Sequence, residues 1–134
     1  MMREFTHGGE HDEQLFGLVG GLAFRKSVHD ELASAVSSEP GDIWFVYTDG
    51  GGITTGFAQM RMAKNGSAHI RYVYSENSGV RMSLIRAAMA KAKKLDASLV
   101  YTNDRKAAME WHTLEFSKKP TAREGEFVRW EKVL

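Results

Sequence analysis

The fold is decided by one stretch of the chain, Tyr74-Ser75-Glu76-Asn77-Ser78-Gly79-Val80-Arg81-Met82-Ser83. The residues before it read as a strand, and residues 80–95 lack Pro and Gly and are rich in helix formers. The first turn of a helix has backbone N–H groups without intrahelical partners and carries roughly half a positive charge. We therefore expect a strand, a turn and a long helix that together offer an anion site at the carboxyl end of the strand.

Arg81 makes this junction unusual. A basic side chain in the first turn of a helix has the wrong sign for the helix dipole. A phosphate bound at the helix start would account for it. The alternative remains open that the junction is only structural, with Asn77 and Ser78 capping the helix and Gly79 making the turn.

Two short helices are expected at the start of the chain. The first covers residues 12–20 and is interrupted by Gly20-Gly21. The second follows Ser27, which with Asp30 three residues later approximates a capping box, and it ends at Pro40-Gly41. The Gly-rich residues before the first helix are expected to be mobile.

An antiparallel meander and a strand–helix–strand unit are expected to complete the fold. Asn65-Gly66 suits the hairpin turn of the meander, and Asp104 is the expected N-cap of a short helix. The strands are expected at residues 43–47, 53–62, 68–75, 97–101 and 127–133, and the later helices at residues 80–95 and 104–114. The order ααβββαβαβ predicts one α/β (α+β) domain, residues 1–134, whose mixed sheet is flanked by helices and has parallel pairing across the long helix.

The composition narrows the class of protein. The chain has 134 residues, of which 43% are hydrophobic and 26% charged, and this is typical of a globular domain. It has no cysteine, which excludes disulfides, thiolate metal sites and a cysteine nucleophile. No apolar run approaches the roughly 20 residues of a membrane span, and the first residues lack the apolar region of a secretory signal. We expect a soluble, cytoplasmic protein with no membrane partner.

The charge is unevenly distributed, although the net value is only +1. Residues 61–106 carry ten basic and three acidic residues, whereas residues 1–40 carry three basic and seven acidic ones. The basic segment suggests a polyanionic ligand, such as a phosphate-bearing cofactor or nucleic acid. The other interpretation is that Lys91, Lys93 and Lys94 form a solvated helix face. No recognised nucleic-acid motif is present, so no nucleic-acid partner is expected.

The residues from Ser75 to Phe116 follow the pattern of a known family. The junction Glu76-Asn77-Ser78-Gly79-Val80-Arg81 is followed by Leu84-Ile85, by a strand that ends in Thr102-Asn103, and by Ala107, Trp111 and Phe116. This order of elements and residues resembles the GCN5-related N-acetyltransferases (GNAT), which have the acyl-CoA N-acyltransferase fold. The family motif at the junction is Arg/Gln-x-x-Gly-x-Gly/Ala.

The resemblance implies a coenzyme A site between two central parallel strands that splay apart. Backbone groups of the strand before the junction would pair with the pantetheine arm, and amides at the helix start would hold the pyrophosphate. The implied activity is transfer of an acetyl group from acetyl-CoA to a primary amine of a small molecule or a protein. The implied cofactor-binding residues are Val73, Tyr74, Ser75, Gly79, Val80, Arg81, Met82, Ser83 and Asn103.

Four positions depart from the family pattern. Glu76 stands where the family has Arg or Gln, and Arg81 stands where it has the second Gly or Ala. Trp111 replaces a Tyr, and an indole N–H can donate a hydrogen bond but cannot titrate. Glu115 replaces the Gly before the Phe. The chain is therefore either a divergent acetyltransferase or a catalytically degenerate protein of this fold that binds coenzyme A or a protein partner without turnover.

Other side chains are available to replace the missing phenol and to act as a base. Tyr74 and Tyr101 are the candidates for the phenol, and Tyr74 shares a sheet face with Tyr72. Glu76 and His69 are the candidates for the base. Glu76 is the better placed, because His69 is expected to lie far from the opening. Alternatively, the tyrosines only pack in the strands and Glu76 only caps the helix.

The sequence gives weaker signals for the position of the acceptor amine, for a metal site and for the oligomeric state. The acceptor amine is expected near Gly20-Gly21, where the acidic residues of the first 40 attract a cation. His7 and His11 flank Glu10, but no metal site is expected in this segment. Exposed edge strands in a small mixed sheet are compatible with a homodimer.

Overall fold

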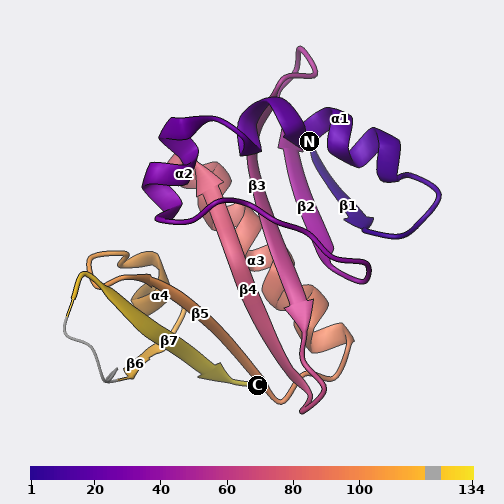
Figure 1. The fold of residues 1–134 in the computed structure, drawn as a ribbon. Coiled ribbons are helices and arrows are strands. Elements are labelled where there is room, and N and C mark those ends of the chain that lie inside the picture. Colours follow the sequence, from indigo (N-terminus) through magenta and orange to yellow (C-terminus); the bar gives the residue numbers. More distant parts are fainter. Residues whose placement is uncertain (120–124) are drawn as a thin grey trace.

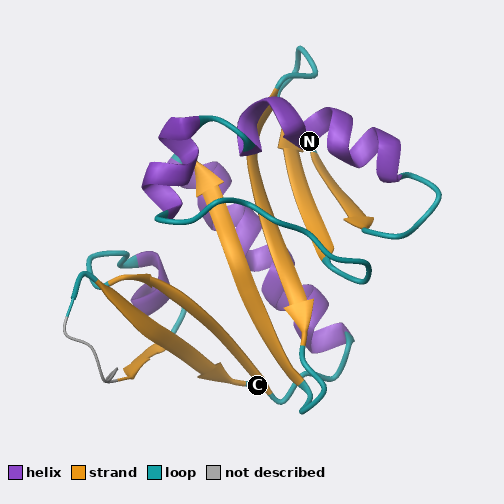
Figure 2. Cartoon of the chain, in the orientation of Figure 1, coloured by secondary structure: helices purple, strands orange, loops and turns teal. Residues whose placement is uncertain are grey.

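The residues that the computed structural model describes, 1–119 and 125–134, form one mixed sheet of seven strands with helices on both faces. Its elements are β1 (Met2–Thr6), α1 (Asp12–Ala23), α2 (Lys26–Leu32), β2 (Ile43–Thr48), β3 (Thr54–Met62), β4 (Ser67–Ser75), α3 (Ser78–Lys94), β5 (Leu99–Arg105), α4 (Glu110–Thr113), β6 (Ser117–Lys119) and β7 (Phe127–Val133). The strand order is β1-β2-β3-β4-β5-β7-β6. Figure 1 and Figure 2 show α1 and α2 on one face and α3 on the other.

Two hydrophobic clusters lie between these layers. One contains Leu84, Ala88 and Ala92, which lie on one face of α3, together with residues of the facing strands. Leu95 is the C-cap of α3 and is exposed. The other cluster packs α1 and α2 against the opposite face around Trp44. The centre of the sheet is therefore covered on both faces.

The fold class predicted from the sequence is confirmed. The meander β2–β3–β4, the long helix and the last strand are present, and β4 and β5 are parallel across α3. The predicted hairpin forms with Gly66 at a φ of +84°, and the Ser67 N–H donates to Asn65 Oδ1 at 3.0 Å. Within the described part of the chain, no helix has the length and apolar content needed to cross a membrane.

The predicted order lacks two strands, β1 and β6. β1 pairs antiparallel with β2 and lies before the Gly-rich segment that was expected to be mobile. Only Phe5 of β1 is buried, and one buried residue in five gives too weak a period-two pattern to predict a strand. β6 consists of three exposed residues paired with β7, and nothing in its sequence marks it as a strand.

α1 continues through Gly20-Gly21 to Ala23, so the predicted interruption is wrong. Its inner face buries Leu15, Val19 and Leu22. Packing of this face supplies most of the stability of such a helix. It outweighs the roughly 0.5–1 kcal/mol that each interior glycine costs relative to alanine.

α2 is shorter than predicted and has a different N-cap. It begins after Arg25, so that Ser27 lies inside the helix and not at the cap position. It ends at Leu32, where Ala33 adopts a left-handed φ of +53°. Pro40-Gly41 therefore does not end this helix, and residues 34–39 cross the α1/α2 face of the sheet as an irregular segment (Figure 2).

The helix predicted at residues 104–114 is mostly strand and loop. β5 extends to Arg105, and α4 covers only Glu110–Thr113. Asp104 therefore caps no helix, and its carboxylate accepts hydrogen bonds from Arg81 and Trp111. A polar strand end followed by helix formers is hard to distinguish from a helix start by pattern alone.

A β-bulge divides β4 into two parts. The register between β3 and β4 shifts between Gln59 and Met60, and Arg71 is the extra residue on β4. The Arg71 guanidinium donates to Gln59 Oε1 at 2.6 Å and lies 3.4 Å from Asp42 Oδ2. A bulge bends its strand and increases the local twist, so the second half of β4 takes a new direction.

The buried carboxylate of Asp42 holds the bulge in place. Arg61 Nε and Nη2 donate to it at 2.6 and 2.7 Å, and the Glu39 N–H donates at 2.8 Å. Burial by itself would raise the pKa of Asp42, but the hydrogen bonds from Arg61 and Glu39 and the charges of Arg61 and Arg71 hold it below 3.8. The carboxylate therefore stays ionised and paired where β4 changes direction.

Alanine substitutions at Gly56 of β3 and at Gly21 of α1 should change the stability of the protein in opposite directions, because only Gly21 has room for a Cβ. A Cβ at Gly56 would lie 2.9 Å from Tyr74 O and 3.0 Å from Leu84 Cδ1, whereas a Cβ at Gly21 would meet nothing within 4 Å. We expect Gly56→Ala to lower the free energy of unfolding by about 1–3 kcal/mol, because the β4 backbone must shift. Gly21→Ala should raise it by about 0.5–1 kcal/mol. Urea unfolding measures both, and equal destabilisation by the two variants would contradict this packing.

Candidate functional site

The site is built where β4 and β5 part. The two strands pair at only three positions, Ser67 with Leu99, Ala68 with Val100 and His69 with Tyr101. The bulge at Arg71 follows directly, and Figure 1 shows the two strands diverging from their shared start. The edge of β4 beyond His69 then has backbone groups that need partners other than β5.

Two side chains replace strand pairing along this edge. Thr102 Oγ1 of β5 donates to Ile70 O at 2.8 Å. Arg81 Nη1 of α3 donates to Val73 O, also at 2.8 Å. The open edge of β4 is therefore satisfied from within the protein at these two carbonyls.

Arg81 joins three elements at the wide end of the gap. Besides Val73 O, its guanidinium donates to Asp104 Oδ2 of β5 at 2.6 Å and to Glu110 of α4. One guanidinium thus faces two carboxylates, and 19% of the Arg81 side chain remains exposed. The side chain lies across the gap between the diverging strands and ties their ends to α4.

The start of α3 lies beside this gap and retains two free donors. Asn77 is the N-cap, and its Oδ1 accepts from the Val80 N–H at 3.0 Å. The Arg81 N–H donates to Asn77 O. Among the described residues, we find no acceptor for the N–H groups of Ser78 and Gly79, which are exposed. Of the amides assigned to the pyrophosphate, only that of Gly79 is thus free; the amides of Met82 and Ser83 bond within the helix.

The remaining cofactor candidates lie on two sides of the sheet. Val73 is buried in the cluster under α3, and Ser75 Oγ donates to Thr55 O at 2.9 Å. Asn103 is exposed on the α2 side of β5, whereas Asp104 faces α3 and α4. Asn103 and Asp104 therefore point to opposite faces of the sheet. Of the two, Asp104 is the one whose side chain lies at the Arg81 end of the gap.

Two of the departures from the family pattern have structural explanations. Trp111 is fully buried, its Nε1 donates to Asp104 Oδ2 at 2.9 Å, and it packs edge-on against Phe116. It therefore supports the partner of Arg81 from within the core. Glu115 has a φ of +67°, a conformation that glycine adopts without strain, which accounts for the glycine of the family pattern.

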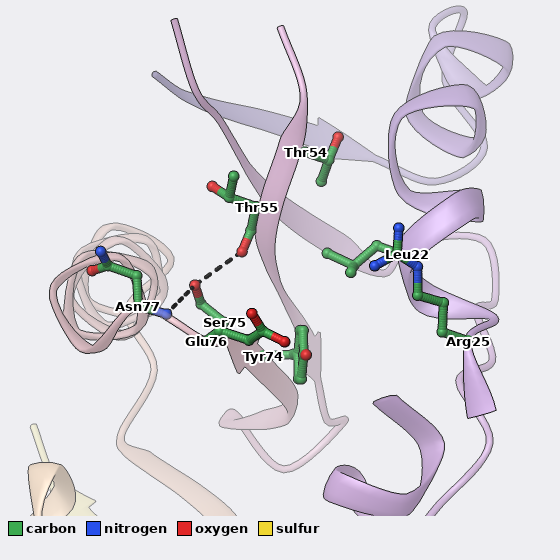
Figure 3. Close-up of a pocket in the computed structure, with 8 residues that line it drawn as sticks. All are labelled: Leu22, Arg25, Thr54, Thr55, Tyr74, Ser75, Glu76 and Asn77. Carbon is green, nitrogen blue, oxygen red and sulfur yellow. Dashed lines mark hydrogen bonds between the residues drawn. The ribbon is translucent and has the colours of Figure 1, made fainter. Parts of the chain in front are cut away.

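A cavity of about 280 Å³ lies at the shared end of β3 and β4 (Figure 3). Figure 3 shows Glu76 beside Tyr74, across from Leu22 and Arg25 at the end of α1. Burial raises the pKa of Tyr74 above its ordinary value of 10, and the nearby charges of Glu76 and Glu31 raise it further. The phenol is therefore protonated at neutral pH and available as a proton donor.

A second depression, of about 430 Å³, lies on the α2 side where β4 and β5 separate, and His69 lines it together with Arg71, Tyr72 and Asn103. His69 stacks on Tyr101 with ring centroids 4.4 Å apart. The expectation that His69 lies far from the opening is wrong, because His69 occupies the last paired position before the strands part. The opening begins in the middle of β4, at a bulge that the sequence does not reveal.

Burial makes His69 a neutral side chain. It lowers the pKa of His69 from 6.5 to about 4, and the positive charges of Arg71, Arg129 and Arg61 contribute. A neutral imidazole can accept a hydrogen bond at pH 7, but a base with so low a pKa is a weak proton acceptor.

The structure thus groups the catalytic candidates into two pairs. Tyr74 and Glu76 lie together at the carboxyl end of β4, and His69 and Tyr101 lie together where the strands part. Sequence reasoning missed Glu110 as a partner of Arg81. An acidic residue in the predicted last helix was the only available signal, and nothing in the sequence placed it beside α3.

Acidic residues from elsewhere in the fold neutralise much of the basic segment 61–106. Among the described residues, five of its ten basic residues form ion pairs, namely Arg61 and Arg71 with Asp42, Arg81 with Asp104 and Glu110, Lys91 with Glu4, and Arg105 with Glu126. Lys93 and Lys94 are exposed on α3. The segment charge is therefore weaker support for a polyanionic ligand than the sequence suggested.

Comparison with known proteins gives matches in structure and none in sequence. Neither models of protein families nor curated protein sequences match the chain. The chain is similar to the ribosomal-protein-alanine N-acetyltransferase of Brucella melitensis, with a TM-score of 0.70 and 13% identity over 100% of this chain and 99% of that chain. An acyl-CoA N-acyltransferase from Pseudomonas aeruginosa gives a TM-score of 0.69 and 12% identity over 99% of each chain.

A structure that holds a ligand is also similar. It is described as a streptothricin acetyltransferase from Bacillus anthracis in complex with acetyl coenzyme A, and it gives a TM-score of 0.56 and 14% identity over 72% of this chain and 65% of that chain. These likenesses show that the chain has the acyl-CoA N-acyltransferase (GNAT) fold. The three proteins named here are described as acyltransferases.

The pKa of His69 gives a testable pH dependence of stability. Between pH 6.5 and about 4 the unfolded chain binds a proton at this residue that the folded protein does not bind, so the free energy of unfolding should decrease as the pH falls through this window. We expect the free energy of unfolding to fall less in His69→Gln than in wild type between pH 7 and pH 5. His11→Gln, at an exposed position, is the control. Urea unfolding at the two pH values measures the difference, and an equal loss in His69→Gln and wild type would contradict the assignment.

Proposed function

We propose that the protein is an acyltransferase that transfers an acetyl group from acetyl-CoA to a primary amine of a small molecule or a protein. The observation that carries the proposal is the parting of β4 and β5 next to the start of α3. An unpaired strand edge offers acceptors to an amide-bearing arm, and free amides at a helix start offer donors to a diphosphate. The acyltransferases with the same fold add independent support.

The residues that would hold the co-substrate fit its chemistry, with one disagreement. Val73, Tyr74 and Ser75 would supply backbone groups to the pantetheine arm, and the free amides of Ser78 and Gly79 would bind the phosphates. The disagreement is that Arg81 bonds the Val73 carbonyl. Binding of the arm at this carbonyl therefore requires Arg81 to move.

The cavity of Figure 3 is the proposed place for the acceptor amine. It lies at the end of α1, close to the position expected from the sequence. Glu76 would attract the cationic amine and take one proton, which frees the nitrogen lone pair for attack, and Tyr74 would give a proton to the departing thiolate. The second proton that the nitrogen loses as the amide forms would return to Tyr74 and restore the phenol. The new bond joins the amine nitrogen to the acyl carbon, and the carbon–sulfur bond breaks.

A non-catalytic protein of the same fold is the second candidate. Two observations favour it: Arg81 lies across the gap that the arm would enter, and Trp111 is buried where the family has a Tyr. Such a protein would bind coenzyme A or a protein partner without turnover.

Titration with acetyl-CoA, followed by thermal unfolding, tests the binding step. A ligand that binds only the folded protein stabilises it by RT ln(1 + [L]/Kd), and we expect Tm to rise by several degrees. ADP is the matched control, because it carries the diphosphate and the nucleoside without the pantetheine arm. Failure of acetyl-CoA to raise Tm above the ADP control would contradict the proposed co-substrate.

Release of free thiol with a panel of amines tests turnover and separates an enzyme from a binder. We expect Glu76→Gln and Tyr74→Phe each to reduce turnover by about 100-fold or more, because each removes a proton-transfer group. Glu13→Gln and Tyr47→Phe change the same residue types away from the cavity and should leave turnover unchanged. Tyr101→Phe tests the other tyrosine candidate in the same assay. Full activity of Glu76→Gln and Tyr74→Phe would overturn these roles, and binding without thiol release would favour the second candidate.

A further inference from the structure

Arg81 and an incoming acyl donor would compete for the same backbone group. The Arg81 Nη1 donates to Val73 O at 2.8 Å, on the edge of β4 that β5 leaves unpaired. The same guanidinium is held from the far side of the gap by Asp104 and Glu110. The gap is therefore closed by a side chain that belongs to the helix start itself.

We propose that Arg81 is a latch that opens only for acyl donors carrying phosphates, so that the protein selects acetyl-CoA over phosphate-free thioesters. This inference rests on the proposed function. In the closed state, Arg81 binds Val73 O, Asp104 and Glu110. In the open state, it exchanges the two carboxylates for the phosphates of the donor, and Val73 O becomes free for the pantetheine arm.

The position of Arg81 on α3 makes the exchange geometrically direct. Arg81 lies three residues after Ser78, so both are on one face of the helix. The free amides of Ser78 and Gly79 mark where an anion would bind on that face. A long side chain rooted there reaches this point by rotation about its own bonds, without movement of the helix.

The charges of the closed state make opening conditional on the ligand. One guanidinium is shared between two carboxylates, whose side chains are 23% and 25% exposed. Water can therefore reach these carboxylates once the guanidinium leaves. A phosphate matches the guanidinium fork at least as well as a carboxylate does. An uncharged thioester could replace the bond at Val73 O through an amide of its arm, but it offers Arg81 no new partner in exchange for the contact that Arg81 gives up.

The test compares two donors on the same protein. Dissociation constants of acetyl-CoA and S-acetylpantetheine are measured by calorimetry for wild type, Arg81→Ala and Arg86→Ala. Arg86 is an exposed arginine of the same helix and serves as the matched control. The ratio of the two constants in each variant is the readout, because a general loss of stability affects both ligands alike.

We expect Arg81→Ala to bind S-acetylpantetheine about tenfold or more tightly than wild type does, since the latch no longer competes for Val73 O. The preference for acetyl-CoA should fall by at least a similar factor, because a charge-assisted contact to the phosphates is also lost. Arg86→Ala should keep the wild-type ratio. If Arg81→Ala does not fold, Glu110→Gln removes one of the two carboxylates that hold the closed state and should tighten binding of acetyl-CoA.

Each alternative outcome has its own signature. An unchanged ratio in Arg81→Ala, with wild type binding acetyl-CoA, would overturn the latch and leave the proposed function standing. Binding of acetyl-CoA by Arg81→Ala but not by wild type would also overturn it, because Arg81 would then be a permanent block. No binding of either donor to any variant would overturn the proposed function itself.

Discussion

The buried carboxylate of Asp42 is the constraint on which the shape of the site depends. It pairs with Arg61 and Arg71, and Arg71 is the bulge residue of β4. The bulge follows the last position at which β4 and β5 pair, so the ion pairs of Asp42 hold the sheet together at the point where it opens. Removing one partner of a buried ion pair costs far more stability than removing one partner of an exposed pair. We therefore expect the position of the opening to be strongly constrained.

An opened sheet must satisfy backbone groups that a continuous sheet would pair. Here Thr102 and Arg81 bond two carbonyls of the exposed edge. The first contact lies between the two strands and is buried, whereas the second comes from α3 and remains partly exposed. The same edge is therefore bonded by a buried contact near the bulge and by a partly exposed contact at its outer end, and the proposed donor site lies at the outer end.

Local sequence patterns predicted the fold but not the details of the site. The expected strands at residues 43–47, 53–62 and 68–75, the Asn-Gly turn and the helix-forming run after Gly79 predicted the meander and the crossover helix. The strand β1 and the continuity of α1 through Gly20-Gly21 depend on tertiary packing, which outweighs local preference. Arg81 was identified as anomalous from its sign at a helix start. Its partners Asp104 and Glu110 are 23 and 29 residues away, and no local pattern connects them to it.

Amide hydrogen exchange with and without acetyl-CoA is the most direct measurement of the central claim, that the outer edge of β4 and the start of α3 together form the donor site. The account predicts slower exchange at Ser78 and Gly79 and along residues 73–75 when acetyl-CoA is present, with no change in the β1–β2 pair. Unchanged exchange at Ser78 and Gly79 under saturating acetyl-CoA, or protection confined to another part of the sheet, would contradict it.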